Sequence, residues 1–242
     1  MSTSKPASPP NSRHAPDLTY HSPGSGIWLR LLEKVRPARA NDDPRDRAVL
    51  GHGRVCLGPP QPMDYQAWAD LRRASRASLQ PWEPVWPNDA LSRTGYGRRI
   101  AHQCSEWNAD RAYNFLIWRV EDGALLGGMA LSNIRRGVAQ AGTLGYWIGT
   151  EFGGQGYMTE ALQATIQFGF EELDLNRLEA ATLQENAASR RLLTSAGFAE
   201  EGLARDYLKI NGQWADHVLY GLTRAAWSPE ADSAETGDPD FI

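Results

Sequence analysis

Three glycines within four residues precede a stretch with helical spacing, in the segment Gly153-Gly154-Gln155-Gly156-Tyr157-Met158. Glycine removes side chains where a backbone must approach a ligand closely. The first turn of a helix has unpaired N–H groups and carries the positive end of the helix dipole. The segment therefore predicts a site for a phosphorylated cofactor, and a plain strand-to-helix turn is the alternative.

Two common phosphate-binding motifs do not match this segment. A P-loop has Lys followed by Ser or Thr after its last glycine, whereas Gly156 is followed by Tyr157. A dinucleotide-binding loop has a further glycine three residues after the second, and here that position is Thr159. The spacing therefore indicates a phosphorylated cofactor of another kind.

The elements around the loop follow from the spacing of apolar residues. The helical segment repeats apolar groups at Met158, Leu162 and Ile166, which predicts a helix over 158–173 with one buried stripe. Asn211-Gly212 between two strand-like runs is the strongest short signal for a hairpin. Further strands are predicted over 54–57, 113–120, 125–133, 143–148 and 177–183, and further helices over 64–78, 91–109 and 186–196.

Composition divides the chain of 242 residues into three parts. Residues 1–50 hold seven of the fifteen prolines, so they are predicted to be a disordered N-terminal extension. Residues 51–228 form the folded domain, and residues 229–242 form an acidic, disordered tail. Within the extension, a helix over 27–35 would carry Ile27, Leu31, Leu32 and Val35 on one face. Such a helix is a docking segment, a membrane-surface helix, or a piece that packs weakly on its own domain or has no function.

Several classes of protein are disfavoured by composition. The net charge of −4 gives no general attraction to nucleic acid. Cys56 and Cys104 have no motif spacing, so they are predicted to be buried thiols in a reducing compartment. Neither an apolar leader, a membrane span nor metal-ligand spacing is present, and we expect a cytoplasmic protein without a metal.

Four segments in a fixed order carry a resemblance to a known family: 79–85 with Pro81-Trp82-Glu83-Pro84, the glycine segment 154–161, 185–198 with Asn186-Ala187-Ala188-Ser189, and 201–219. In this order the chain resembles the GNAT acetyltransferases, and within them the RimJ and RimL type of ribosomal-protein-alanine N-acetyltransferase. The resemblance covers roughly residues 52–228. It implies an α+β fold in α/β/α layers, with a mixed, mostly antiparallel, twisted sheet, splayed central strands and flanking helices.

The resemblance also implies that the phosphorylated cofactor is acetyl-CoA. Its pyrophosphate would meet the N–H groups of Gly153, Gly154, Gln155, Gly156, Tyr157 and Met158. Its pantetheine arm would pair with the backbone near Trp147 and Ile148, and Asn186 and Ser189 would complete the cofactor site. One departure is Glu151, at a position where the family usually has Arg or Gln, and we expect it to weaken binding.

The catalytic residues implied by the resemblance are Ser189 as the acid and Asp206 as the base. Many family members use a tyrosine as the acid seven residues after the position of Asn186, but here that residue is Leu193. Two other interpretations stay open. Asn186 and Ser189 are also typical capping residues at a helix start, and Asp206 is equally a surface strand residue paired with a cation.

Glu83 and Trp82 are the candidate acceptor-binding residues, although Glu83 could instead brace its proline-rich turn. The leading expectation is transfer of an acetyl group to a protein N-terminal α-amine, such as that of a ribosomal protein beginning with Ala or Ser. The alternatives are a small-molecule amine acetyltransferase and a non-catalytic, acetyl-CoA-binding ribosome-assembly factor. In the last case the basic N-terminal arm, with eight Lys and Arg against five Asp and Glu, would contact RNA.

Overall fold

A computed structural model describes residues 19–21, 27–30 and 43–228 of the chain. Within this part, the strands are β1 (Thr19–His21), β2 (Ile27–Arg30), β3 (Leu50–His52), β4 (Val55–Gly58), β5 (Tyr113–Arg119), β6 (Leu125–Arg135), β7 (Ala141–Ile148), β8 (Arg177–Leu183), β9 (Ala199–Ile210) and β10 (Gln213–Thr223). The α-helices are α1 (Tyr65–Ala74), α2 (Arg76–Leu79), α3 (Arg93–Asn108), α4 (Tyr157–Gln167) and α5 (Ala187–Ser195).

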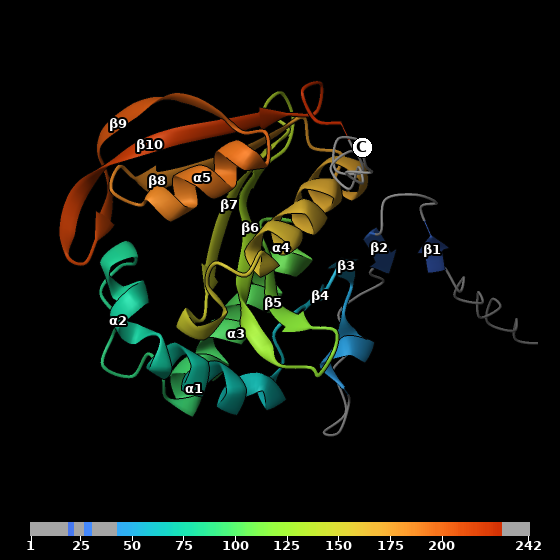
Figure 1. The fold of residues 1–242 in the computed structure, drawn as a ribbon, viewed down its shortest axis with the longest axis vertical. Helices are drawn as coiled ribbons and strands as arrows, with labels where there is room; N and C mark the ends of the chain where they lie inside the picture. The colour runs from blue at the N-terminus through green and yellow to red at the C-terminus, as the bar shows by residue number, and fades with distance from the viewer. Residues whose placement is uncertain (1–18, 22–26, 31–42, 229–242) are drawn as a thin grey trace, which may run out of the picture.

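The strands form one mixed sheet in the order β1-β2-β3-β4-β5-β6-β7-β8-β10-β9, as Figure 1 shows. Every neighbouring pair is antiparallel except β7 and β8, which run parallel. That parallel pairing extends over only three residues, from Ala141 to Thr143 on β7. The fold is therefore the predicted one, a mostly antiparallel sheet with flanking helices whose central strands separate.

Side chains of β5 alternate between two hydrophobic clusters, one on each face of the sheet. Phe115 and Ile117 belong to a cluster that includes α4, whereas Leu116 and Trp118 belong to a cluster that includes Trp68 of α1. The alternation is the period-two pattern of a strand buried on both faces. Helices therefore cover both faces of the central sheet and hold it in place.

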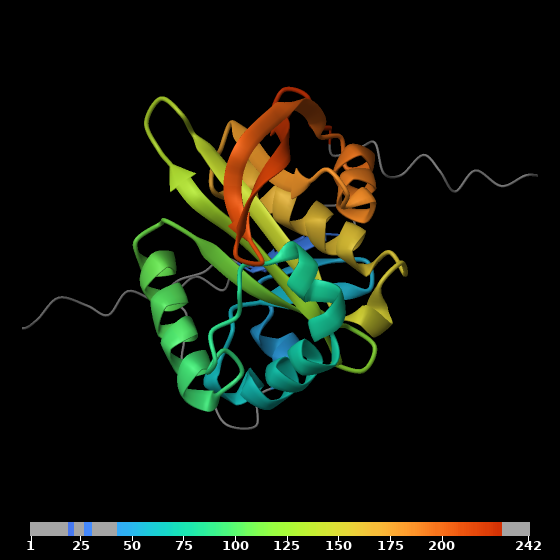
Figure 2. The ribbon, with the colours of Figure 1, turned by 90° about the vertical axis from the view of Figure 1, so that its left-hand side faces the viewer.

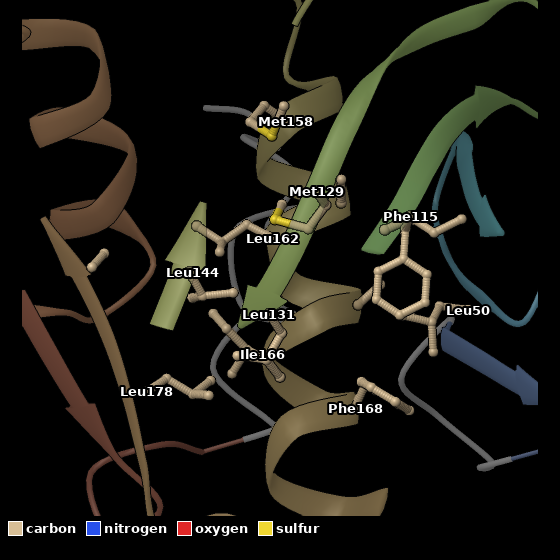
Figure 3. Packing of buried hydrophobic residues seen from close by; sticks show 14 of the residues in the cluster. Leu50, Phe115, Met129, Leu131, Leu144, Met158, Leu162, Ile166, Phe168 and Leu178 are labelled. Carbon is tan, nitrogen blue, oxygen red and sulfur yellow. The ribbon is translucent and has the colours of Figure 1, made fainter. Parts of the chain in front are cut away.

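Helix α4 is the central element of the larger cluster, and Figure 3 shows its apolar residues against the sheet. Leu162 and Ile166 are completely buried, as their four-residue spacing predicts. Burial of such a side chain stabilises a fold by about 1.5–3 kcal/mol. This packing fixes the start of α4, and with it the glycine segment that precedes it.

Some expectations about local structure need correction. Ile27–Arg30 is a strand, not the start of a helix, because the edge of β3 offers backbone partners that local spacing does not reveal; residues 31–35 lie outside the described residues. The helix over 158–173 ends at Gln167 and continues as a π-helical turn, η5 (Phe168–Glu172). Cys104 is exposed on α3, whereas burial raises the pKa of the Cys56 thiol to about 11.

The short 3-10 segments are η1 (Pro44–Arg47), η2 (Pro62–Asp64), η3 (Gln80–Trp82) and η4 (Thr150–Phe152). β3 begins at Leu50 and β10 ends at Thr223, close to the predicted limits of the folded domain at 51 and 228. The acidic tail, 229–242, and most of the N-terminal extension lie outside the described residues. The three-part division of the chain stays a prediction.

Candidate active site

The glycine segment connects η4 to α4 and exposes its backbone. Gly154 and Gly156 have φ angles of +72° and +85°, the left-handed region that glycine adopts without strain. A Cβ atom at Gly154 would meet no other atom within 4 Å. Gly156 is the N-cap of α4 and brings no capping side chain, so the first N–H groups of the helix stay available to a ligand. Residues of this kind fit a pyrophosphate.

The side chains after the glycines point into the protein. Tyr157 and Met158 are 7% and 9% exposed and belong to the hydrophobic cluster around α4. They can therefore offer a cofactor only their backbone groups. Gln155 is exposed, and its Nε2 donates to the carbonyl oxygen of Glu151 at 2.7 Å. Of the predicted cofactor-binding residues in this segment, Gln155 thus has the one side chain that remains near the surface.

An arginine that sequence reasoning missed braces the loop. Arg54, in the turn between β3 and β4, forms an ion pair of 2.5 Å with Glu160 of α4. It also donates to the carbonyl oxygen of Gln155 at 2.9 Å, and its guanidinium lies 4.5 Å from the centre of the Tyr157 ring. The hydrogen bond to Glu160 raises the pKa of Arg54. Arg54 thus places a permanent cation beside the glycine segment.

The splayed end of β7 lies beside this loop. Leu144–Ile148 pair with β6 but not with β8, because the β7–β8 pairing stops at Thr143. Backbone groups of Trp147 and Ile148 on the β8 side are therefore free of sheet partners within the described residues. An extended ligand arm that carries amides can pair with such a strand edge. The residues fit the predicted pantetheine arm.

A pair of hydroxyl groups bridges the opening between β7 and the start of α5. The Tyr146 hydroxyl lies 2.7 Å from Ser189 Oγ. Burial raises the pKa of Tyr146 to about 12, so its hydroxyl stays protonated at neutral pH. Sequence reasoning identified Ser189 but not Tyr146, because nothing local connects residues 43 positions apart.

Asn186 has the capping role that the sequence left open. Its side-chain oxygen accepts from the Ser189 N–H at 3.0 Å, which caps α5. The cap fixes the first turn of α5 and with it the position of Ser189. Leu193, where many relatives have a tyrosine, is completely buried in the hydrophobic cluster.

A cavity of about 190 Å³, here called the inner cavity, lies between α3 and the sheet and is bordered by Tyr146 and Trp147. Next to it lies an open groove of about 720 Å³, the outer groove, which reaches Glu179 on β8 and Tyr207 on β9. Both spaces share the lining residues Arg99, Gln103 and Asn114. Figure 2 views this side of the molecule, with α3 in green at the lower left and the β9–β10 hairpin in orange.

Glu83 lines the inner cavity, but its carboxylate already has three hydrogen bonds. Arg72 donates two of them, at 2.7 and 2.6 Å, and Trp86 Nε1 donates the third at 2.7 Å. The Arg72 guanidinium lies between the rings of Trp86 and Trp147, at 4.3 and 4.8 Å from their centres. This geometry favours the bracing role of Glu83. The other predicted acceptor residue, Trp82, is 41% exposed and does not border the inner cavity.

Asp206 lies on β9 at an irregularity in the β9–β10 pairing. It is exposed, its φ angle is +46°, and its N–H donates to Asp216 Oδ1 at 2.9 Å. It borders neither the inner cavity nor the outer groove, although Tyr207 beside it does border the groove. The structure brings Ser189 together with Tyr146 but shows no contact between Ser189 and Asp206 within the described residues.

Two other kinds of site are not seen in the described part of the chain. Its His, Cys, Asp and Glu residues include no group of three that could hold a metal ion. None of its helices is both long and apolar enough to cross a membrane.

Comparison with known proteins places these features in one family. A family model described as an acetyltransferase (GNAT) domain matches residues 54–199. A ribosomal protein uS5-alanine N-acetyltransferase of Escherichia coli (strain K12) is 36% identical over 168 residues, which cover 69% of this chain and 87% of that protein. A probable N-acetyltransferase of Bacillus subtilis (strain 168), YjcK, is 33% identical over 168 residues, which cover 69% of this chain and 93% of that protein. The solved structure of Mycobacterium smegmatis RimJ in complex with CoA-disulfide superposes with a TM-score of 0.68 at 32% identity, covering 71% of this chain and 82% of that one.

Proposed function

This chain belongs to the GNAT family of acetyltransferases and is an acyltransferase that uses acetyl-CoA, and we propose that its acceptor is the N-terminal α-amine of a protein. The observation that carries this proposal is the shape of the acceptor side. A small inner cavity beside Tyr146 adjoins a larger, open outer groove, and the two spaces share three lining residues. Such a space suits the end of a polypeptide, with the first residue inside and the following residues along the groove.

The charges of the acceptor side argue against a polycationic small molecule. Such an acceptor needs free carboxylates, but the carboxylates that line the two spaces are held by arginine in the ion pairs Arg72–Glu83, Arg111–Glu106 and Arg135–Glu179. The Escherichia coli relative is named for alanine of ribosomal protein uS5. A ribosomal protein with a small first residue is therefore the acceptor that we propose.

The cofactor site in this proposal is largely backbone. The N–H groups of residues 153–158 would hold the pyrophosphate, and the free edge at Trp147 and Ile148 would hold the pantetheine arm. Acetyl-CoA supplies the acetyl group as a thioester. Arg54 holds the loop through its hydrogen bond to the carbonyl oxygen of Gln155, and its charge is already paired with that of Glu160.

The acid in this proposal is Ser189, supported by Tyr146. Tyr146 donates its proton in the hydrogen bond to Ser189 Oγ, which leaves the Ser189 proton free for the departing sulfur. Asn186 holds the first turn of α5 and so orients Ser189. A non-catalytic binding protein would have no need of a protonated tyrosine held against this serine.

The base has a modest task when the acceptor is an α-amine. Such an amine has a pKa of about 7.7–8.0, against about 10.4 for lysine, so much of it is neutral near pH 7.5. We assign proton removal to Asp206. Because its side chain is exposed and lies outside the inner cavity, the proton would pass to it through water.

Thiol release from acetyl-CoA tests the proposal against a panel of acceptors. The panel comprises a peptide that begins with Ala, the same peptide with its N-terminus blocked and one internal lysine, and an aminoglycoside. The proposal expects the free Ala peptide to be used fastest. Faster use of the aminoglycoside, or thiol release that no acceptor stimulates, would overturn it.

A further inference from the structure

Helix α3 carries polar side chains where a helix that covers a sheet normally carries apolar ones. Its two buried residues, Tyr96 and Trp107, lie near its ends. Between them Arg99 and Gln103 follow at spacings of three and four residues, on the same side of the helix. Both line the inner cavity and the outer groove. This middle part of α3 therefore faces a space that can hold a polar ligand.

Both side chains have polar groups without a protein partner. Within residues 43–228 and the two short strands before them, Arg99 forms neither a hydrogen bond nor an ion pair, and its guanidinium lies 5.8 Å from the Trp68 ring centre. Gln103 Nε2 donates to Asn114 Oδ1 at 3.2 Å, but Gln103 Oε1 is buried without a hydrogen-bond partner. A buried acceptor without a partner is unfavourable unless a ligand supplies the donor. The pair thus offers a cation and a hydrogen-bond acceptor.

The charge of Arg99 is not balanced by its surroundings. Apart from the exposed His102, the other charged side chains lining the two spaces are neutralised in the pairs Arg72–Glu83, Arg111–Glu106 and Arg135–Glu179. Arg99 is therefore the group there that attracts an anion. A planar guanidinium binds a carboxylate with two parallel hydrogen bonds.

The position of Arg99 indicates which acceptor residue it would meet. It borders the inner cavity, which is next to Tyr146, and also the outer groove. An extended chain advances about 3.3–3.6 Å per residue. Because Arg99 borders both spaces, a chain with its first residue in the inner cavity would pass Arg99 with the next residues, the second or the third.

Resting on the proposed function, we infer that Arg99 and Gln103 form a specificity subsite for acceptors with Asp or Glu at the second or third position. Arg99 pairs with the acidic side chain. Gln103 Oε1, which is buried in the free protein, accepts from a backbone N–H of the acceptor once the Gln103 side chain turns toward the bound chain. The subsite selects among protein N-termini and takes no part in the transfer itself.

The test compares kcat/KM for matched peptides that begin with Ala and carry Glu, Gln or Lys at the second or third position. The wild-type protein should favour a Glu peptide over its Gln counterpart by about tenfold, the value of one charge-assisted hydrogen bond. Arg99→Gln should abolish this preference by lowering kcat/KM for the Glu peptide far more than for the Gln peptide. Arg99→Glu should reverse it in favour of Lys.

Arg98→Gln is the matched control, because Arg98 is an exposed arginine of the same helix that pairs with Asp89; it should keep the preference. The affinity for acetyl-CoA should not change in Arg99→Gln, and a loss would instead place Arg99 against the cofactor. Equal use of Glu and Gln peptides by the wild type, or an equal loss of both rates in Arg99→Gln, would overturn this inference and leave the proposed function intact. Turnover of no peptide would overturn both.

Discussion

The proposed cofactor side is one nearly continuous stretch of backbone, whereas the proposed acceptor side is built from side chains of distant elements. The glycine segment 153–158 and the free edge of β7 present N–H and carbonyl groups. The inner cavity instead takes its walls from α1, α3, the 81–87 turn and three strands. A binding site made of backbone groups depends on the conformation of the chain, so few amino-acid substitutions alter it. A binding site made of side chains changes with each substitution among its lining residues. Acetyl-CoA use and acceptor choice can therefore vary independently in this fold.

Ser189 Oγ lies 2.7 Å from the hydroxyl of Tyr146, which borders the inner cavity, and changing Ser189 should have the largest effect on turnover. Ser189→Ala should lower kcat by roughly 10²–10⁴, the usual contribution of a positioned acid or base, with little effect on acetyl-CoA affinity. Ser195→Ala on the same helix is the control, because Ser195 Oγ donates only to the carbonyl oxygen of Leu192. Steady-state kinetics with saturating acetyl-CoA measure both, and equal rates would remove Ser189 from the mechanism.

Tyr146→Phe should have a smaller effect, about tenfold in kcat, because it removes one hydrogen bond but leaves Ser189 in place. The raised pKa of Tyr146, about 12, means that the protonated form persists well above neutral pH. The wild-type rate should therefore not fall between pH 8 and about pH 10 because of this group. A decline with an apparent pKa near 9 that disappears in Tyr146→Phe would contradict the assigned protonation state.

Gly154→Asp tests the cofactor side alone. It adds a negative side chain where the structure leaves open space, and acetyl-CoA affinity should fall by about 100-fold. The matched control is Gly137→Asp in the β6–β7 turn, which has a similar φ of +66° and equally open surroundings. At 100 Kd acetyl-CoA stabilises a protein by about 2.7 kcal/mol. In a thermal-shift measurement, acetyl-CoA should stabilise the Gly137→Asp control by this amount and the Gly154→Asp variant hardly at all. Equal stabilisation of the two variants would place the cofactor elsewhere.

Glu83→Gln separates two roles on the acceptor side. The Arg72 side chain is only 8% exposed, so removing its partner leaves a buried charge unpaired, and the protein should lose about 3 kcal/mol of stability. Asp70→Asn, which breaks the exposed Arg73–Asp70 pair, should leave stability almost unchanged. Denaturant unfolding measures both. A higher KM for the acceptor with unchanged stability would show that Glu83 binds the amine instead.

Asp206→Asn should have the smallest effect. Because Asp206 is exposed and outside the cavities, its loss should lower kcat by less than the 10²–10⁴ typical of a positioned base. The loss should shrink as pH rises past about 8, where the α-amine is already neutral. Asp216→Asn controls for the shape of the strand, since Asp216 accepts from the Asp206 N–H. A constant deficit at every pH would indicate a structural role.

The contrast between the two sides also explains what the sequence could predict. The glycine loop, α4 and β8 were predictable because each is continuous in sequence and has clear spacing. Asn186 was predicted to be either a helix cap or a cofactor-binding residue, and in the structure its side chain caps α5. Tyr146, Arg54 and Arg99 were missed, because their roles depend on partners brought close only by the fold. The helix predicted from Ile27 was wrong at Ile27–Arg30 for the same reason, since β3 supplies its partner.

The most direct test of the proposed acceptor is to locate the acetyl group by tandem mass spectrometry. The substrate is one peptide that begins with Ala and contains one internal lysine, incubated with the full chain and acetyl-CoA near pH 7.5. Both amines then compete in one molecule, and the α-amine is far more often neutral. We expect acetylation of the N-terminal alanine by the wild-type protein, and little acetylation by the Ser189→Ala variant. Acetylation of the lysine, or of neither amine while a small-molecule amine is acetylated, would contradict it.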